Sequence, residues 1–456
     1  MTGLAFAVLL SAALAGYAMN RRAALALRNG GERLHSLGSF HGLYALLLVL
    51  VPAFVATILW IMLEGSVINA LTLSGLPDGM LAAATNPQLI LTEIQSIAGG
   101  RIFGTPEPWK LEAADRMVAL RATSGWLLVA VIAALSAALL YVSRRQVTAD
   151  FRARQAAERI VMGLMITCSL IAVFVTIGIV FSLVFESVRF FQMVPLTEFL
   201  FGTRWEPQMP IRADQVAAEG AFGVLPVFLG TLVITFVAIV IAVPVGLLSA
   251  IYLNEFASRR FRAVAKPVLE LLAGIPTVVY GFFAILTVAP ALRAWGAALG
   301  IPVAPNTALA AGGVMAIMLI PFISSFADDA LSAVPRSLRD GAIALGATRS
   351  ETVLNVLFPA AIPGIMGGVL LAVSRAIGET MIVVMAAGLI ATMNINPLDS
   401  VTTITVQIVT LLIGDTAFDS PKTLAAFALG LMLFIVTLFI NILALRIVRK
   451  YREQYD

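Results

Sequence analysis

Charged residues are scarce in this chain of 456 residues, at 12% of the sequence, whereas 60% of its residues are hydrophobic. An average soluble domain carries about 25% charged residues. The composition therefore excludes an ordinary water-soluble enzyme, a disordered tail and a nucleic-acid-binding protein. The single cysteine, Cys168, cannot form an intrachain disulfide, which excludes a disulfide-rich secreted scaffold, and we expect it to be a small buried apolar residue. The two histidines, His35 and His41, are too few for a His/Cys metal cluster.

The motifs of common ATPases and hydrolases are also missing. None of the lysines, which are Lys110, Lys266, Lys422 and Lys450, follows the glycine pattern of a phosphate-binding P-loop. The sequence contains neither H-E-x-x-H nor G-x-S-x-G. We therefore expect a non-enzymatic transport or scaffold role and no cofactor on this chain.

Long apolar stretches dominate the sequence instead. A helix needs about 20 apolar residues to cross the hydrocarbon core of a membrane, and nine segments meet this requirement. We expect an all-α polytopic membrane protein. The first segment lacks the positively charged start of a secretory signal, and Arg21 and Arg22 follow it, so we expect a retained span. The nine candidates are about 2–19, 42–63, 124–142, 158–185, 226–252, 268–290, 306–328, 359–391 and 423–446.

Lysine and arginine are distributed unevenly among the connections. Alternate connections hold 20 and 9 of the 30 Lys and Arg residues. The positive-inside rule places the richer set in the cytoplasm. This predicts a periplasmic N-terminus and a cytoplasmic C-terminus, in agreement with an odd number of spans. The richer set comprises 20–41, 143–159, 253–267, 329–358 and 446–456.

A polar, basic linker at 143–159 separates two hydrophobic blocks and is the best internal boundary. We therefore expect an N-terminal membrane extension over 1–157, with three spans and an outer loop, and a second domain over 158–456, with six spans. Segment 359–391 is too long for one straight crossing. We expect it to be tilted, or broken near Pro363 and Gly364.

The cytoplasmic loop 329–358 is long and has helical periodicity. Small residues near Ala342 share one helical stripe, Gly346 is placed to end a helix, and Thr348 can cap the next one. The pattern predicts a short helix, a tight turn and a second helix that leads into Pro359. A face of small residues allows another protein to approach closely, which favours docking of a cytoplasmic partner.

This loop resembles the coupling loop of ATP-binding cassette (ABC) importer permeases, whose pattern is E-A-A-x-x-x-G, nine residues, then I-x-L-P. Four positions differ from that pattern, and its spacing is intact. The resemblance implies a segment, 340–359, that inserts into the ATPase subunit and transmits its motion. The matching residues are Asp340, Gly341, Ala342 and Gly346, followed after nine residues by Val356, Phe358 and Pro359.

Arg375 and Glu379 are the only charged residues between positions 352 and 398. A charge in the middle of a membrane span costs several kcal/mol, so it is expected to face the protein interior or a pathway. At a spacing of four residues in one helix the two can pair. In one interpretation, Glu379 holds the Arg375 guanidinium until an oxyanion competes for it. In the other, the pair is permanent and fixes helix packing.

The stretch S-R-A-I-G-E-T-M around this pair is similar to one in the phosphate-specific ABC importer family, in the permease subunit of the PstC type. The likeness covers about 158–456. It implies a six-helix permease core with Arg375 and Glu379 on the translocation path. About three extra transmembrane helices precede this core and depart from the family's six-span pattern, and the resemblance assigns them no role. The sister subunit, of the PstA type, tends to have Ala and Pro where this chain has Met381 and Ile382. Further similar segments are 199–207, 222–232, 242–257 and 269–284.

The family resemblance also implies partners and a location. It predicts a bacterial inner-membrane protein surrounded by lipid that pairs with the sister permease, receives phosphate from a periplasmic phosphate-binding protein, and couples to a cytoplasmic PstB-type ATPase dimer that binds ATP and Mg. Two other functions stay open. One is a permease for another oxyanion, such as phosphonate, molybdate or sulfate, and the other is a membrane regulator of anion supply.

A few further residues carry weaker expectations. Glu270 is a candidate partner of Lys266, four residues earlier, or a carboxylate on the path. Asp328 and Asp329 are expected to cap the inner end of their span and to be solvated. Trp205 is expected to be an anchor at the membrane surface. The segment 88–97 has some helical amphipathicity and favours a surface helix.

Overall fold

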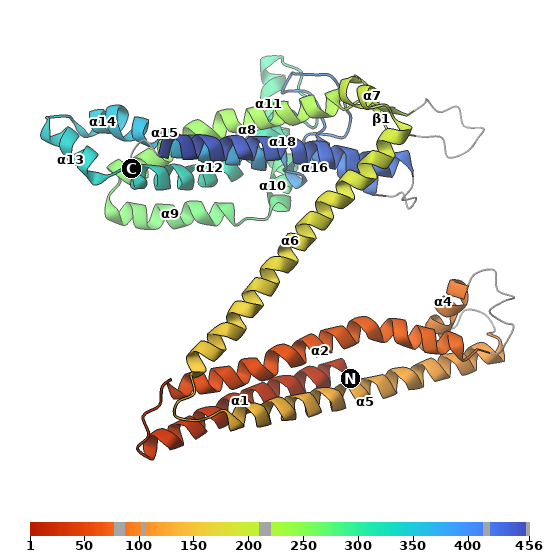
Figure 1. Cartoon of the computed structure of the whole chain (residues 1–456). Coiled ribbons are helices and arrows are strands. Elements are labelled where there is room, and N and C mark those ends of the chain that lie inside the picture. The colour runs from red at the N-terminus through yellow and green to blue at the C-terminus, as the bar shows by residue number, and fades with distance from the viewer. Residues whose placement is uncertain (77–86, 102–105, 209–219, 414–419, 453–456) are drawn as a thin grey trace. The chain divides into compact units, whose positions relative to one another are not determined.

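The computed structural model describes residues 1–76, 87–101, 106–208, 220–413 and 420–452. Within these ranges the regular secondary structure is helical apart from one antiparallel hairpin of two short strands. Nine helical segments of the described chain are long and apolar enough to cross a membrane, which confirms the expected fold class and span number. The chain divides into two compact units, Met1–Phe174 and Val175–Asp456, and helix α6, Ala153–Met193, contributes to both (Figure 1).

The N-terminal unit is built from three long helices that pack on one another: α1 (Thr2–Asn29), α2 (Gly38–Ser74) and α5 (Pro108–Arg145). Membrane helices associate closely where small residues line the interface. A Cβ at Gly42 of α2 would lie 2.9 Å from the backbone oxygen of Tyr17 in α1, so this crossing requires glycine. The expected amphipathic helix is α4, Pro87–Ala98, and it packs against α5.

The C-terminal unit contains the longer series of elements, which we give in chain order. After α6 come α7 (Leu196–Phe201), β1 (Trp205–Glu206), β2 (Ala221–Phe222), α8 (Leu225–Ile251), the π-helical turn η1 (Tyr252–Phe256), α9 (Arg259–Ala273), α10 (Thr277–Phe283), the π-helical turn η2 (Ala284–Val288), α11 (Ala289–Leu299), α12 (Ala308–Ala333), α13 (Arg336–Ala344), α14 (Arg349–Thr352), the π-helical turn η3 (Val353–Leu357), α15 (Phe358–Ile377), α16 (Met381–Ala386), α17 (Ile404–Leu412) and α18 (Pro421–Arg452).

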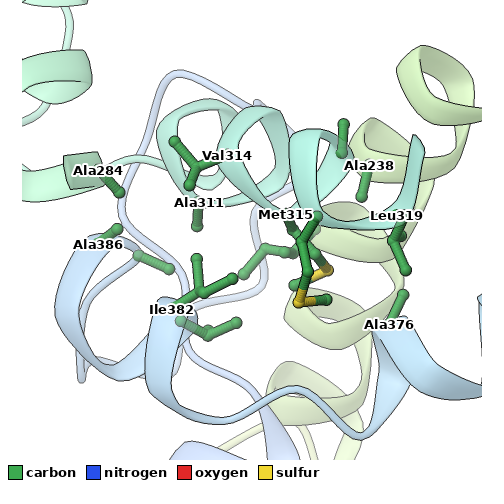
Figure 2. Packing of buried hydrophobic residues seen from close by; sticks show 14 of the residues in the cluster. Ala238, Ala284, Ala311, Val314, Met315, Leu319, Ala376, Ile382 and Ala386 are labelled. Carbon is green, nitrogen blue, oxygen red and sulfur yellow. The ribbon is translucent and has the colours of Figure 1, made fainter. Parts of the chain in front are cut away.

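Helix α12 forms the centre of the C-terminal unit and packs against α8 and α15. It is the most buried of the candidate spans within the described residues. Figure 2 shows Met315 and Leu319 of α12 among small side chains of neighbouring elements, including Ala238 of α8 and Ala376 of α15. Alanine at these contacts lets the helix backbones approach one another, which is how packing is achieved without a strong hydrophobic driving force in lipid.

The structure contradicts the expected break near Pro363 and Gly364 and the expected burial of Cys168, while the alternative of a tilted span stays a prediction. Helix α15 runs through Pro363 and Gly364 without a break, and the interruption comes at Gly378, where α15 ends and α16 has not yet begun. Cys168 is exposed on α6, because no other element of its unit covers that part of the helix. The domain limits 1–157 and 158–456 stay a prediction.

Candidate translocation and coupling sites

The interruption between α15 and α16 places the two charged residues of the apolar span in different environments. Glu379 lies in the interruption, and its Oε1 accepts hydrogen bonds from the backbone N–H groups of Met381, at 3.1 Å, and Ile382, at 3.5 Å. The Thr405 hydroxyl donates to the Glu379 carbonyl at 2.8 Å. A break inside a membrane span leaves backbone groups without helical partners, so these contacts stabilise the interruption.

Arg375 occupies the last turn of α15, where a cation interacts favourably with the helix dipole. Its guanidinium lies over the Phe322 ring of α12, with its central carbon 5.6 Å from the ring centroid. The side chain is exposed, and no carboxylate of the described residues forms an ion pair with it. The expected Arg375–Glu379 pair is therefore not formed, because the helix ends before Glu379. The donors of the guanidinium remain open to an anion.

The predicted helix–turn–helix in the loop 329–358 is confirmed. Helix α13 ends in a Schellman motif, with the N–H of Gly346 bonded to the Ile343 carbonyl and that of Ala347 to the Ala342 carbonyl. Gly346 has φ of +90°, which explains the need for glycine. Thr348 then caps α14 in a reciprocal capping box with Glu351, as its position in the sequence indicates.

The two halves of the coupling pattern have different surroundings. In the first half, Asp340 and Gly341 are exposed on α13, and no atom lies within 4 Å of a Cβ built at Gly341. Leu345, next to the turn, is 91% exposed. In the second half, Phe358 at the start of α15 packs against a buried cluster at the C-terminal ends of α8 and α12. The segment therefore offers an open, partly apolar surface on a base that is packed into the bundle.

A cluster of charged residues lies near this base and was not foreseen from the sequence. The Asp328 carboxylate binds Arg262 at 2.9 and 3.1 Å and Lys266 at 2.7 Å, both from α9. It also accepts a hydrogen bond of 2.6 Å from Asn254 of η1. Its side chain is only 8% exposed, so the expectation of solvation is wrong for Asp328, whereas Asp329 is exposed. Lys266 pairs with Asp328, so the expected pair between Lys266 and Glu270 is not formed.

A second ion pair connects α13 to η1, the turn that follows α8. Arg339 of α13 pairs with Glu255 of η1, whose side chain is 10% exposed. Sequence reasoning missed this contact because the two residues lie 84 positions apart. From the sequence alone, a charged residue at the end of a span, such as Glu255, is expected to be solvated rather than paired.

In the C-terminal unit, a buried hydrogen bond connects β1 to α17. The Nε1 of Trp205 donates to the Gln407 side-chain oxygen at 2.9 Å, and Trp205 is only 5% exposed. The Gln407 amide group donates in turn to the Leu389 carbonyl and the Thr402 hydroxyl. Trp205 is therefore a structural contact between the hairpin and α17, and the expectation of a membrane-surface anchor is wrong.

Comparison with known proteins identifies the class. Residues 242–453 match the family model described as the binding-protein-dependent transport system inner membrane component. A probable ABC transporter permease of Bacillus subtilis (strain 168), YqgH, is 34% identical over 63% of this chain and 89% of its own length. The chain belongs to this family: it is a multi-pass permease subunit of an ABC transporter complex, and it is not itself an enzyme.

The N-terminal region narrows this class. Residues 6–175 match a family model described as phosphate ATP-binding cassette transporter. The phosphate transport system permease protein PstC 1 of Mycobacterium bovis is 34% identical over 55% of this chain and 81% of its own length. The protein is thus a PstC-type permease subunit of a phosphate ABC importer. The solved methionine ABC transporter MetNI is similar at 21% identity, over 50% of this chain and 94% of its own, with a TM-score of 0.37.

Proposed function

We propose that Arg375 and Glu379 lie on the path along which this subunit moves phosphate. The observation that carries the proposal is that the two charged residues make different contacts at the helix interruption. Glu379 is bonded to backbone amides of the next helix, which leaves the exposed Arg375 guanidinium without a carboxylate competitor among the described residues. A planar guanidinium binds a phosphate oxyanion through parallel N–H bonds. Arg375 contacts the anion, and Glu379 maintains the backbone conformation that presents it.

We further propose that segment 340–359 docks into a cytoplasmic ATPase dimer of the PstB type. Asp340, Gly341 and Ala342 form the contact face on α13, and Gly346 sets the turn. In the second half of the segment, which contains Val356, Phe358 and Pro359, Phe358 packs against the bundle and fixes this face to it. The open space above Gly341 and the exposure of Leu345 support this role. ATP and Mg are bound by the ATPase, so this chain needs no cofactor.

The same proposal assigns the remaining partners and the orientation. A PstA-type sister permease provides the other wall of the path, and a periplasmic phosphate-binding protein delivers the anion. The N-terminus lies in the periplasm and the C-terminus in the cytoplasm of a bacterial inner membrane, where lipid covers the exposed apolar faces. The arrangement of Lys and Arg supports this orientation.

Uptake of labelled phosphate by cells that lack their own permease tests the site. Cells are complemented with this chain and its partner subunits, and membrane levels are measured. We expect Arg375→Gln to abolish uptake while Arg154→Gln, in the exposed Arg154–Glu158 pair, leaves it unchanged. Normal uptake by Arg375→Gln at normal membrane levels refutes the path assignment.

Two additions sharpen the test. Glu379→Gln keeps an oxygen that accepts the amide hydrogen bonds, whereas Glu379→Ala does not. We therefore expect uptake to survive better in the first variant. An excess of phosphonate, molybdate or sulfate should leave phosphate uptake unchanged. Strong competition by one of these anions identifies a different substrate.

A further inference from the structure

The π-helical turn η1, at the C-terminal end of α8, joins two other helices through consecutive side chains. Asn254 donates to Asp328 of α12 at 2.6 Å and to the Ser332 hydroxyl at 2.9 Å. Glu255 pairs with Arg339 of α13. Because Asp328 also binds Arg262 and Lys266, this junction connects α8, α9, α12 and α13.

Apart from this ion pair, the main contacts of α13 are with α14 and η3, which follow it in the chain. Helix α13 has nine residues and none of them is buried. A linker of two residues, 334–335, separates it from α12, and the Gly346 turn follows it. Without a side-chain anchor the helix can pivot about these two points. The Glu255 side chain is 10% exposed, so the ion pair with Arg339 is mostly shielded from solvent at its carboxylate end.

We propose that the Glu255–Arg339 pair is the positioning contact that transmits displacement of α13 to α8, and through Asn254 and Asp328 to α12 and α9. Glu255 and Arg339 do not touch the transported anion. A largely buried ion pair adds little net stability, but its geometry is restrictive, which suits a mechanical link. The proposal rests on the ATPase-coupling role of segment 340–359. It predicts that loss of the pair separates ATP hydrolysis from transport.

The test uses the whole transporter, reconstituted in liposomes with its sister permease, ATPase dimer and binding protein. Phosphate uptake and ATP hydrolysis are measured in the same vesicles. We expect Glu255→Gln and Arg339→Gln each to lower the phosphate moved per ATP hydrolysed by at least about fivefold, while the ATPase remains bound. The exchanged double variant, Glu255→Arg with Arg339→Glu, should recover at least about half of the ratio.

A matched control removes another arginine from an ion pair. Arg154→Gln breaks the Arg154–Glu158 pair, whose side chains are 62% and 58% exposed, and it should leave the phosphate-to-ATP ratio unchanged. If Glu255→Gln does not accumulate in membranes, Glu255→Asp and Arg339→Lys carry the test, because both keep their charge at an altered length. They should lower the ratio by a smaller factor.

The outcomes separate this proposal from the coupling role on which it rests. Gly341→Trp blocks the open face of α13 and should remove the ATPase from the purified complex. If it does so and the Glu255 and Arg339 variants keep the wild-type ratio within about twofold, the positioning contact is refuted and the docking segment stands. If Gly341→Trp retains the ATPase, the docking segment itself is wrong. Recovery in the exchanged double variant supports the positioning contact specifically.

Discussion

Replacing Asp328 by asparagine should destabilise the C-terminal unit, because this carboxylate holds two cations and one amide. Its side chain is 8% exposed, whereas those of Arg262 and Lys266 are 36% and 37% exposed. Removing one member of a fully buried ion pair costs about 3–5 kcal/mol. Since both cations here can recover part of their hydration, we expect a smaller loss of about 2 kcal/mol. With the unfolding entropy of a unit of this size, Val175–Asp456, this corresponds to a fall in Tm of about 3 °C.

Thermal denaturation of the purified chain in detergent measures this loss, and the chain provides its own control. Asp329 is adjacent and exposed, so Asp329→Asn should change stability by no more than about 0.5 kcal/mol. Adding Lys266→Met to Asp328→Asn should cost less than the sum of the two single changes, because both remove the same contact. Equal effects of Asp328→Asn and Asp329→Asn would refute the reasoning that the first carboxylate is the centre of a cluster.

Three further changes test separate contacts. Gly346→Ala forces a side chain into a left-handed conformation at a cost of about 1–2 kcal/mol and should weaken ATPase co-purification, whereas Gly341→Ala, in open space on a helix, should not. Gln407→Leu leaves the buried Trp205 N–H without an acceptor, which should destabilise the chain by about 2 kcal/mol in the same denaturation assay. The hydrogen bond between Lys266 and Asp328 raises the pKa of Lys266 above its ordinary value of 10.5. The stability that this contact contributes is therefore complete below pH 10.5 and is lost only as the pH rises through the raised pKa. Lys266→Met should therefore lower Tm equally at neutral pH and at about pH 9.

Features set by nearby residues are the ones that the sequence allowed us to predict. The nine spans follow from hydropathy, and the turn at Gly346 and the cap at Thr348 follow from local backbone chemistry. The charged pair of the apolar span was found for the same reason, since an isolated charge in a hydrophobic run is visible in the sequence. The contacts that Arg375 and Glu379 make could not be predicted from the sequence.

The missed features depend on residues that are distant in the chain. Asp328 meets its partners from 62 to 74 positions away, and Trp205 meets Gln407 across 202 positions. At those distances the sequence shows only a charge or an indole at the end of a span, for which exposure is the ordinary expectation. The helix end at Gly378 was missed for a different reason. Proline is the strongest local signal of a break, yet the bundle accommodates Pro363 within α15.

The coupling segment and the helix interruption are connected by α15 itself. About 24 Å of helix separates Pro359, at the base of the coupling segment, from Arg375. A displacement of that base therefore moves the guanidinium as part of one rigid element. The Glu255–Arg339 pair supplies a second connection, to α8, which packs against α12 beside the same core. If the proposed coupling role holds, we expect α15 and α8 to move together when both connections are intact. With only the first connection, we expect α15 to move against α8, so that ATP is hydrolysed without the concerted movement that transport needs.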